Sequence, residues 1–255
     1  MWNYRYFSSL IIISIIVLIL FRVETVFLII PVAVHVLISF AMSFPIRANF
    51  YLKSIHKGLG NNEKTISLTF DDGPNEKTAV ILDILKRYNV KATFFLVGEN
   101  ITKHKKLVER IHNEGHLIGN HSWNHSYSLT IIPSAIVRKN LQKNNQLIAE
   151  IIGKSPLYFR PPAGITNPGI AKAIKQLGMH SIGWSVRSYD TVIKDAEKCL
   201  NRIISKISGN DILLLHDTCK YAEPLLNKLL PLLSENGIKV VPIDEHIKLN
   251  AYDKS

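Results

Sequence analysis

The chain has 255 residues, an apolar fraction of 47% and a formal net charge of +11. This length allows one domain of about 200 residues with an appendage. The positive charge is spread over lysines on expected helix faces. It is compatible with a solvated surface, anionic lipid or an acidic glycan. No recognisable nucleic-acid-binding motif is present, so we expect no nucleic-acid partner. Cys199 and Cys219 lack CxxC spacing, and we expect two unpaired thiols.

Residues 1–45 are predicted to form an N-terminal membrane anchor. Two apolar runs, residues 7–21 and 26–42, are separated by a link that contains Arg22 and Glu24. A membrane-spanning helix needs about 20 apolar residues, with about 17 near the lower limit. We therefore expect two short transmembrane spans that contact membrane lipid. One span with an interfacial segment, or a cleaved signal peptide, is the alternative.

Residues 46–63 are predicted to be a basic linker to a catalytic domain at residues 64–250. Arg47, Lys53 and Lys57 follow the second apolar run. Positive charge next to a span is typical of the cytoplasmic side. This cue alone would place the domain in the cytoplasm.

After the linker, short apolar runs alternate with segments of helical spacing. We expect strands at residues 65–70, 92–97, 116–120, 157–161, 180–186, 211–216 and 238–243. We expect helices at residues 75–88, 103–115, 133–152, 167–178, 195–207 and 222–237. Seven strands that alternate with six helices predict parallel βαβ units, which form either an open sheet or a closed barrel.

A barrel would gather the polar residues that follow its strands. In (β/α) barrels the reactive side chains lie at the carboxyl ends of the strands. The side chains at these positions are Asp71, Asp72, His121, His125, Arg160, Trp184, Arg187, Asp190, His216 and Asp217. We therefore predict that they share one mouth of the barrel.

His121 and His125 are candidate metal ligands. They are four residues apart, so on one helical turn both imidazoles would share a face. Two neutral imidazoles and one carboxylate with open positions are typical of catalytic zinc or another divalent ion. Taken alone, the HxxxH spacing has a simpler explanation as two surface histidines.

The adjacent carboxylates Asp71 and Asp72 are expected to have different roles, although Asp, Gly and Pro also make ordinary turns. One can bind the metal, and the other can take a proton from a metal-bound water. Arg160 could orient this base, unless it is only a surface arginine beside a turn.

Three further positions are candidates for proton donation, oxyanion binding and substrate contact. His216 ends an apolar strand, where it is either a general acid or a satisfied core histidine. Backbone N–H groups around Ala163, after two prolines, could hold a developing oxyanion. Trp184 is expected to line the substrate groove rather than pack wholly in the core.

Four motifs occur in order, "TFDDGP", "HSWNH", "FRPPAG" and "LLLHD". Together they resemble the polysaccharide deacetylase family, which is also described as the NodB homology domain and carbohydrate esterase family 4. The resemblance covers about residues 64–245. It implies an α/β fold, a distorted (β/α)7 barrel, and a deacetylase site with one divalent metal ion. Zinc is the first expectation for this ion, with cobalt, nickel and manganese as alternatives.

The resemblance also implies a role for each matching residue. Asp71 matches the catalytic base, Arg160 the residue that orients it, and His216 the catalytic acid. Asp72, His121 and His125 match the metal ligands, and the backbone N–H of Ala163 faces the oxyanion. Substrates of the family are N-acetylated or O-acetylated glycans.

One position departs from the family pattern. Many members have an aspartate where this chain has Arg187, and a tryptophan where it has Thr191. A cation beside His216 would lower its pKa, whereas an acid would raise it. Either Asp190 or Asp217 takes the place of the missing acid, or the acid step is weaker, or the substrate differs. Arg187 itself could contact an anionic group on the substrate.

These observations predict a metal-dependent hydrolase that removes acetyl groups from amino sugars of a cell-wall or exported polysaccharide. One alternative is an amidase for a small amide or a lipid-linked sugar. Another is a membrane-bound glycan-binding protein that has lost turnover. Because many relatives are anchored in the membrane and work outside it, we expect an integral membrane protein with an extracytoplasmic catalytic domain, against the charge cue.

Overall fold

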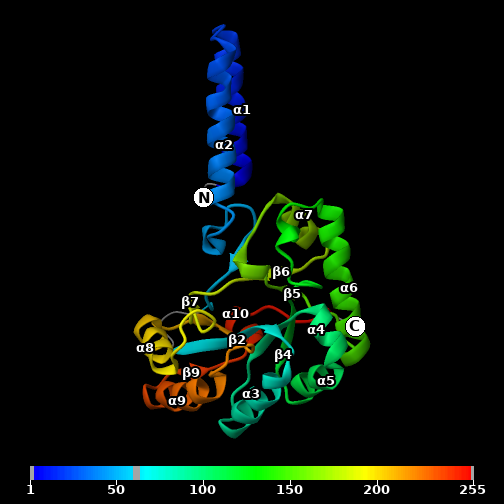
Figure 1. Cartoon of the computed structure of the whole chain (residues 1–255), viewed down its shortest axis with the longest axis vertical. Helices are drawn as coiled ribbons and strands as arrows, with labels where there is room; N and C mark the ends of the chain where they lie inside the picture. Colours follow the sequence, from blue (N-terminus) through cyan, green and yellow to red (C-terminus); the bar gives the residue numbers. More distant parts are fainter. Residues whose placement is uncertain (1–2, 60–63, 254–255) are drawn as a thin grey trace.

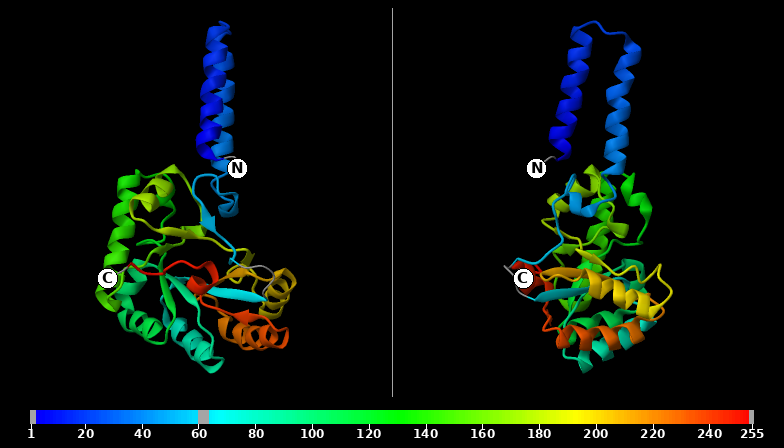
Figure 2. Two further views of the ribbon diagram at one scale, coloured as in Figure 1. Left: turned by 180° about the vertical axis from the view of Figure 1, so that it is seen from behind. Right: turned by 90° about the vertical axis from the view of Figure 1, so that its left-hand side faces the viewer.

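The computed structural model describes residues 3–59 and 64–253, so residues 60–63 of the predicted linker lie outside the described part. A curved parallel sheet forms the centre of the molecule, and helices cover its outer side (Figure 1). The first two helices stand apart from this body as a hairpin, with both of their long axes directed away from it (Figure 2).

The hairpin consists of α1 (Tyr4–Leu20) and α2 (Ile29–Ala41), joined by the 3-10 turn η1 (Thr25–Leu28). Most of its large apolar side chains are exposed. Within the described residues, no helix is both long and apolar enough to cross a membrane. The predicted transmembrane spans at 7–21 and 26–42 are therefore not supported. The physical reason is length: α1 has 17 residues and α2 has 13, which rise about 25 and 20 Å, against a hydrocarbon core of about 30 Å.

The sheet contains nine strands that pair in parallel in the order β1-β6-β5-β4-β3-β2-β8-β7, and β9 also pairs with β2. The strands are β1 (Ser54–Ile55), β2 (Thr65–Gly73), β3 (Thr93–Leu96), β4 (Leu117–Asn120), β5 (Tyr158–Phe159), β6 (His180–Ile182), β7 (Val186–Arg187), β8 (Asp211–His216) and β9 (Lys239–Val240).

The predicted strand at residues 180–186 is two strands in the structure. Its first half, β6, pairs with β5, and its second half, β7, pairs with β8 near the other end of the sheet. Three residues around Trp184 therefore connect a strand near one end of the sheet with the strand at its other end, and the curved parallel sheet forms a half-barrel. A further short strand, β1, lies in the predicted linker and pairs with β6.

The body contains eight helices among the described residues: α3 (Glu76–Arg87), α4 (Gly98–Lys103), α5 (Lys105–Asn113), α6 (Ser134–Ile152), α7 (Pro168–Gln176), α8 (Ala196–Lys206), α9 (Ala222–Glu235) and α10 (Ile243–Ile247). Short 3-10 turns also occur at η2 (Ile46–Ala48), η3 (Tyr127–Thr130) and η4 (Pro162–Gly164). Local sequence explains where α3 begins, because Asn75 and Thr78 form a reciprocal capping box.

The central strand β2 shows how the core positions the polar residues. Successive side chains of a strand point to opposite faces. Ile66, Leu68 and Phe70 are buried in the main core with leucines of α3 and α9. The alternate positions point into the barrel, where Thr69 and Asp71 contact a buried arginine. The inward face of β2 thus carries polar groups up to the carboxyl end of the strand.

Candidate active site

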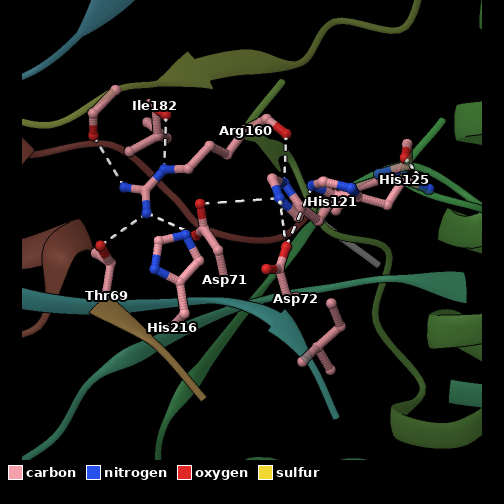
Figure 3. Close-up of polar contacts among 12 residues, drawn as sticks. Thr69, Asp71, Asp72, His121, His125, Arg160, Ile182 and His216 are labelled. Atoms are coloured by element: carbon pink, nitrogen blue, oxygen red, sulfur yellow. Dashed lines mark hydrogen bonds and ion pairs between the residues drawn. The ribbon is translucent and has the colours of Figure 1, made fainter. Parts of the chain in front are cut away.

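The structure brings the predicted residues together around a cavity of about 220 Å³. Figure 3 shows the central group, which comes from the ends of β2, β4, β5 and β8 and the loops after them. The predicted residues that line the cavity are Asp71, Asp72, His121, His125, Ala163, Trp184, Arg187 and His216. Arg160, Asp190 and Asp217 lie behind this surface and act through hydrogen bonds.

Asp71 and Arg160 form a buried ion pair. Nη1 of Arg160 donates to Oδ1 of Asp71 at 2.8 Å and to Oγ1 of Thr69 at 2.7 Å. Nε and Nη2 donate to the carbonyl oxygens of Ile182 and Gly183 at 3.1 and 2.9 Å. Burial lowers the pKa of Arg160, and the negative charge of Asp71 opposes this effect. The guanidinium is thus held from several directions, which leaves Oδ2 of Asp71 directed to the cavity.

The backbone at Asp72 departs from a regular strand, so this side chain reaches the same cavity as Asp71 instead of the opposite face of the sheet. The register between β2 and β3 shifts between Asp71 and Gly73, which is typical of a β-bulge. Asp72 has a φ of 76°, in the left-handed region that aspartate tolerates better than most residues. The Asn100 side chain donates to the Asp72 carbonyl at 2.7 Å and holds this turn. Two adjacent carboxylates can therefore serve different partners.

Asp72, His121 and His125 can hold a metal ion. One ligand atom from each lies within 4.8 Å of the others. Oδ1 of Asp72 is 3.5 Å from Nε2 of His121 and 3.2 Å from Nε2 of His125. Nδ1 of His121 contacts the Arg160 carbonyl at 2.7 Å, and a carbonyl only accepts, so this nitrogen carries the proton. Nε2 then presents a lone pair to the site.

The electrostatics of these three groups fit a cation. Oδ1 of Asp72 is buried and receives no hydrogen bond of normal geometry from the described residues. Burial alone would raise the pKa of Asp72, but the neighbouring imidazoles, led by His121, lower it to about 2. Burial, and then the charge of His121, lowers the pKa of His125 and favours its neutral form. A carboxylate and imidazole lone pairs thus converge, and a divalent cation would satisfy all of them.

The backbone around the two histidines differs from the prediction. They were expected on one helical turn, but residues 121–126 form a loop after β4. Ser122 and His125 have φ values of 68° and 49°, so the loop bends back and returns His125 toward His121. The Ser122 hydroxyl accepts the backbone N–H of His125 at 3.0 Å. A tight polar loop produces the proximity that a helical turn would have given.

His216 pairs with Asp190 on the other side of the cavity. Nδ1 of His216 lies 2.8 Å from Oδ1 of Asp190, and the His216 backbone N–H donates to Oδ2 at 2.7 Å. The Ser188 hydroxyl donates to the same carboxylate at 2.8 Å. Burial lowers the pKa of His216, but the hydrogen bond and charge of Asp190 outweigh it and raise the pKa overall. Nε2 is left to face the cavity as a proton donor.

Asp217, the second candidate for tuning this histidine, has other partners. Its Oδ2 accepts from Thr78 Oγ1 at 2.6 Å, and its Oδ1 accepts from Asn75 Nδ2 at 3.0 Å. It also fills the space beside Gly73, where an added Cβ would lie 1.9 Å from Oδ2. Burial raises the pKa of Asp217 to about 7. Asp217 therefore braces the turn after β2, and Asp190 holds the His216 ring.

Three further predicted residues lie in the wall of the cavity. Ala163 lies in η4 with a φ of 53°. Trp184 is only 8% exposed, so it belongs to the core and to the cavity wall at once. A Cβ atom added to Gly164 would lie 2.5 Å from Cη2 of Trp184, so the tryptophan ring packs directly against this glycine. The guanidinium carbon of Arg187 lies 5.7 Å from the Trp184 ring centroid.

Sequence reasoning missed two residues that matter here. Tyr127 lines the cavity, with its ring centroid 6.3 Å from that of His125, and no motif points to it. Thr69 supports Arg160, and this role could have been inferred from its inward position two residues before Asp71. Cys199 and Cys219 are both free, as predicted, and the structure also shows them to be buried.

Comparison with known proteins gives a consistent result. The sequence model described as "Polysaccharide deacetylase" matches residues 59–182. The chain is 34% identical over 194 residues to a peptidoglycan-N-acetylglucosamine deacetylase of Bacillus cereus, covering 74% of this chain and 90% of that protein. It is 35% identical over 193 residues to the peptidoglycan-N-acetylmuramic acid deacetylase PdaA of Bacillus subtilis, covering 73% of each chain. A solved peptidoglycan N-acetylglucosamine deacetylase superposes with a TM-score of 0.73 at 31% identity, over 78% of this chain and 95% of that one.

Proposed function

The chain belongs to the polysaccharide deacetylase family, and on this premise we propose that it hydrolyses the acetamido group of N-acetylated sugars in a cell-wall glycan with one divalent metal ion. Relatives that act on peptidoglycan support the glycan class. The observation that carries the proposal is the separation of the two acids. Asp71 is paired with Arg160, and Asp72 faces two imidazoles.

Asp72, His121 and His125 would hold the ion. Two histidines and one carboxylate are a common ligand set for catalytic zinc, which makes zinc the first choice over cobalt, nickel or manganese. When bound, such an ion supplies Lewis acidity, which polarises a carbonyl oxygen and lowers the pKa of a nearby water.

Asp71 is placed to act as the general base. Arg160 occupies its Oδ1, and Oδ2 lies 3.8 Å from Nε2 of His121, beside the ligand set. In hydrolysis, water adds its oxygen to the acetyl carbonyl carbon, and its proton passes to Oδ2 of Asp71. The backbone N–H of Ala163 is the expected donor to the negative charge that develops on the carbonyl oxygen.

His216 is placed to act as the general acid. Asp190 binds Nδ1, so Nε2 is the nitrogen that faces the cavity. As the carbon–nitrogen bond breaks, the proton on Nε2 passes to the sugar nitrogen. Acetate and a free amine are then the products. The raised pKa of His216 favours the protonated form that this step requires.

Acetate release from N-acetylglucosamine oligomers and from peptidoglycan, before and after chelation, tests this function. We expect release that is lost with chelator and recovered on addition of zinc. Activity that is insensitive to chelation, or no release from either substrate, would contradict the proposal.

The proposal also has a consequence for location. Peptidoglycan lies outside the cytoplasmic membrane, so we propose that the catalytic domain works on the extracytoplasmic side. Alkaline phosphatase fused after the last residue, which is active only outside the cytoplasm, should be active. A fusion that is made but inactive would remove cell-wall glycans as substrates.

A further inference from the structure

A second cavity of about 550 Å³ adjoins the catalytic one. The two share Trp184 and Arg187 in their walls, so they are immediate neighbours. The rest of the second cavity is built by the segment after α2, by β7 and by α8. Nη1 of Arg47 donates to the Ser185 carbonyl at 3.3 Å, which ties the first of these walls to the barrel.

The walls of this second cavity are strongly basic. The cations that line it are Arg47, Lys57, Arg187, Arg202 and Lys206. Asp211 is the one carboxylate among its described lining residues. It is buried and accepts from Ser185 Oγ at 2.6 Å and from the Ser208 N–H at 2.7 Å, with Lys57 at 3.5 Å. Asp211 therefore hydrogen-bonds to Ser185 and Ser208 and forms an ion pair with only one of the five cations, Lys57.

Two of the arginines are held against a single aromatic ring. The guanidinium carbons of Arg187 and Arg202 lie 4.8 and 4.4 Å from the ring centroid of Tyr189. Nε of Arg202 donates to the Arg187 carbonyl at 3.2 Å, which fixes the pair. Nε of Arg187 is buried and finds no hydrogen-bond partner within the described chain. Because both guanidinium carbons lie within 4.8 Å of the same centroid, the two positive charges are less than about 10 Å apart and repel each other, and a bound anion would relieve the repulsion.

We propose that this basic cavity binds a carboxylate or phosphate group carried by the glycan beside the sugar that is deacetylated. The inference rests on the proposed function, because it names the charge of that substrate. The catalytic cavity is small, so a polymeric substrate must continue beyond it. The neighbouring space beside Trp184 and Arg187 is the basic cavity. Guanidinium groups bind carboxylate and phosphate in two-pronged geometry, which suits an arginine pair.

The test compares three N-acetylglucosamine oligomers of equal length. One is neutral, one contains an N-acetylmuramic acid unit with its carboxylate, and one has a phosphate at the reducing end. We expect a higher kcat/KM for at least one anionic oligomer than for the neutral one. The anionic arm that is favoured identifies the source of the charge.

Arg202→Gln combined with Lys206→Gln should lower the ratio of anionic to neutral kcat/KM by about tenfold, as when a charge-assisted contact is lost. Lys198→Gln is the matched control, because Lys198 is an exposed lysine of the same helix outside the cavity wall. It should keep the wild-type ratio. Arg202→Lys, which retains the charge, should recover part of the preference.

A wild-type ratio near one, or a ratio that the double variant does not change, would overturn the subsite. If no oligomer releases acetate, the proposed function fails instead. In that case, the Kd of each of the three oligomers, measured by calorimetry, tests the subsite independently of catalysis. A Kd that is equal for neutral and anionic oligomers would reject it.

Discussion

Oδ1 of Asp71 lies 2.8 Å from Nη1 of Arg160 in the interior of the barrel, and both side chains are buried. The next residue along the chain, Asp72, instead faces two imidazoles. In a regular strand the two side chains would point to opposite faces, but the register shift and the positive φ of Asp72 let both reach the cavity with different partners. Arg160 compensates the charge of Asp71, and a cation bound by Asp72 and the two imidazoles would compensate that of Asp72, so the cost of placing two acids together is offset.

Because Asp71 and Asp72 have different partners, we expect the substitution of each residue to cause a different defect. Asp71→Asn removes the base but leaves the three ligand atoms, so zinc content should stay near one per chain while kcat falls by about a hundredfold or more. Asp72→Asn replaces a ligand, so both zinc content and activity should be lost. Atomic absorption after dialysis and acetate release measure the two quantities.

The two variants are controls for each other, since both exchange an acid for its amide at adjacent positions. Equal loss of zinc in both would show that the acids share the metal. Full activity in Asp71→Asn would remove Asp71 as the base.

Arg160→Lys should lower kcat although the positive charge is kept. The guanidinium contacts Asp71, Thr69 and two backbone carbonyls at the same time, and an ammonium cannot reach all of them. We expect a loss of about tenfold to a hundredfold in kcat, with zinc content unchanged, because the base is misplaced rather than removed. Arg138→Lys, a substitution on helix α6 outside the cavity, is the control and should leave kcat unchanged. Unchanged kcat in Arg160→Lys would refute the orienting role.

Much of the site could be predicted because it depends on strand ends. Once alternating strands and helices indicate a barrel, residues after successive strands must meet at one mouth. This reasoning placed Asp71, His121, Arg160 and His216 together, and the structure has them in one group. The strand positions followed from short apolar runs that are buried on both faces.

Other features depend on backbone detail that a single sequence does not show. The loop that returns His125 to His121 rests on two residues with positive φ, which residue spacing alone does not reveal. The split of residues 180–186 into β6 and β7 depends on pairing with two strands, β5 and β8, that lie far apart in the sheet. Sequence also left open whether Asp190 or Asp217 serves His216, because both follow strands, and only hydrogen bonds distinguish them.

Asp190→Asn should shift the alkaline limb of the kcat–pH profile to lower pH. Asp190 raises the pKa of His216, so the imidazolium persists to higher pH in the wild type. Loss of the carboxylate charge lowers that pKa, and the acid form is then lost earlier as pH rises. We expect a shift of about one pH unit or more.

Asp217→Asn is the control for this profile. Its carboxylate hydrogen-bonds Thr78 and Asn75 rather than the His216 ring. The alkaline limb should therefore stay in place. A shift caused by Asp217→Asn and not by Asp190→Asn would reverse the assignment.

The same Asp217→Asn variant should change how stability depends on pH. Burial raises the pKa of Asp217 from 3.8 to about 7 in the folded state. Between these values the folded protein keeps a proton that the unfolded chain releases. The stabilisation is therefore complete below pH 3.8 and is lost as pH rises through about 7. Above that, the wild type buries a charge near Asp71 and Asp72, which the amide avoids.

Thermal unfolding of chelator-treated protein at pH 5 and pH 8.5 measures this effect. The Tm of Asp217→Asn minus that of the wild type should be higher at pH 8.5 than at pH 5, by about 5 °C. Glu235→Gln, an exposed acid at the end of α9, should give the same difference at both pH values. A Tm difference for Asp217→Asn that does not change with pH would mean that Asp217 is already ionised in the folded protein at pH 5. The carboxylate would then be stabilised by the hydrogen bonds from Thr78 and Asn75 more strongly than burial opposes it.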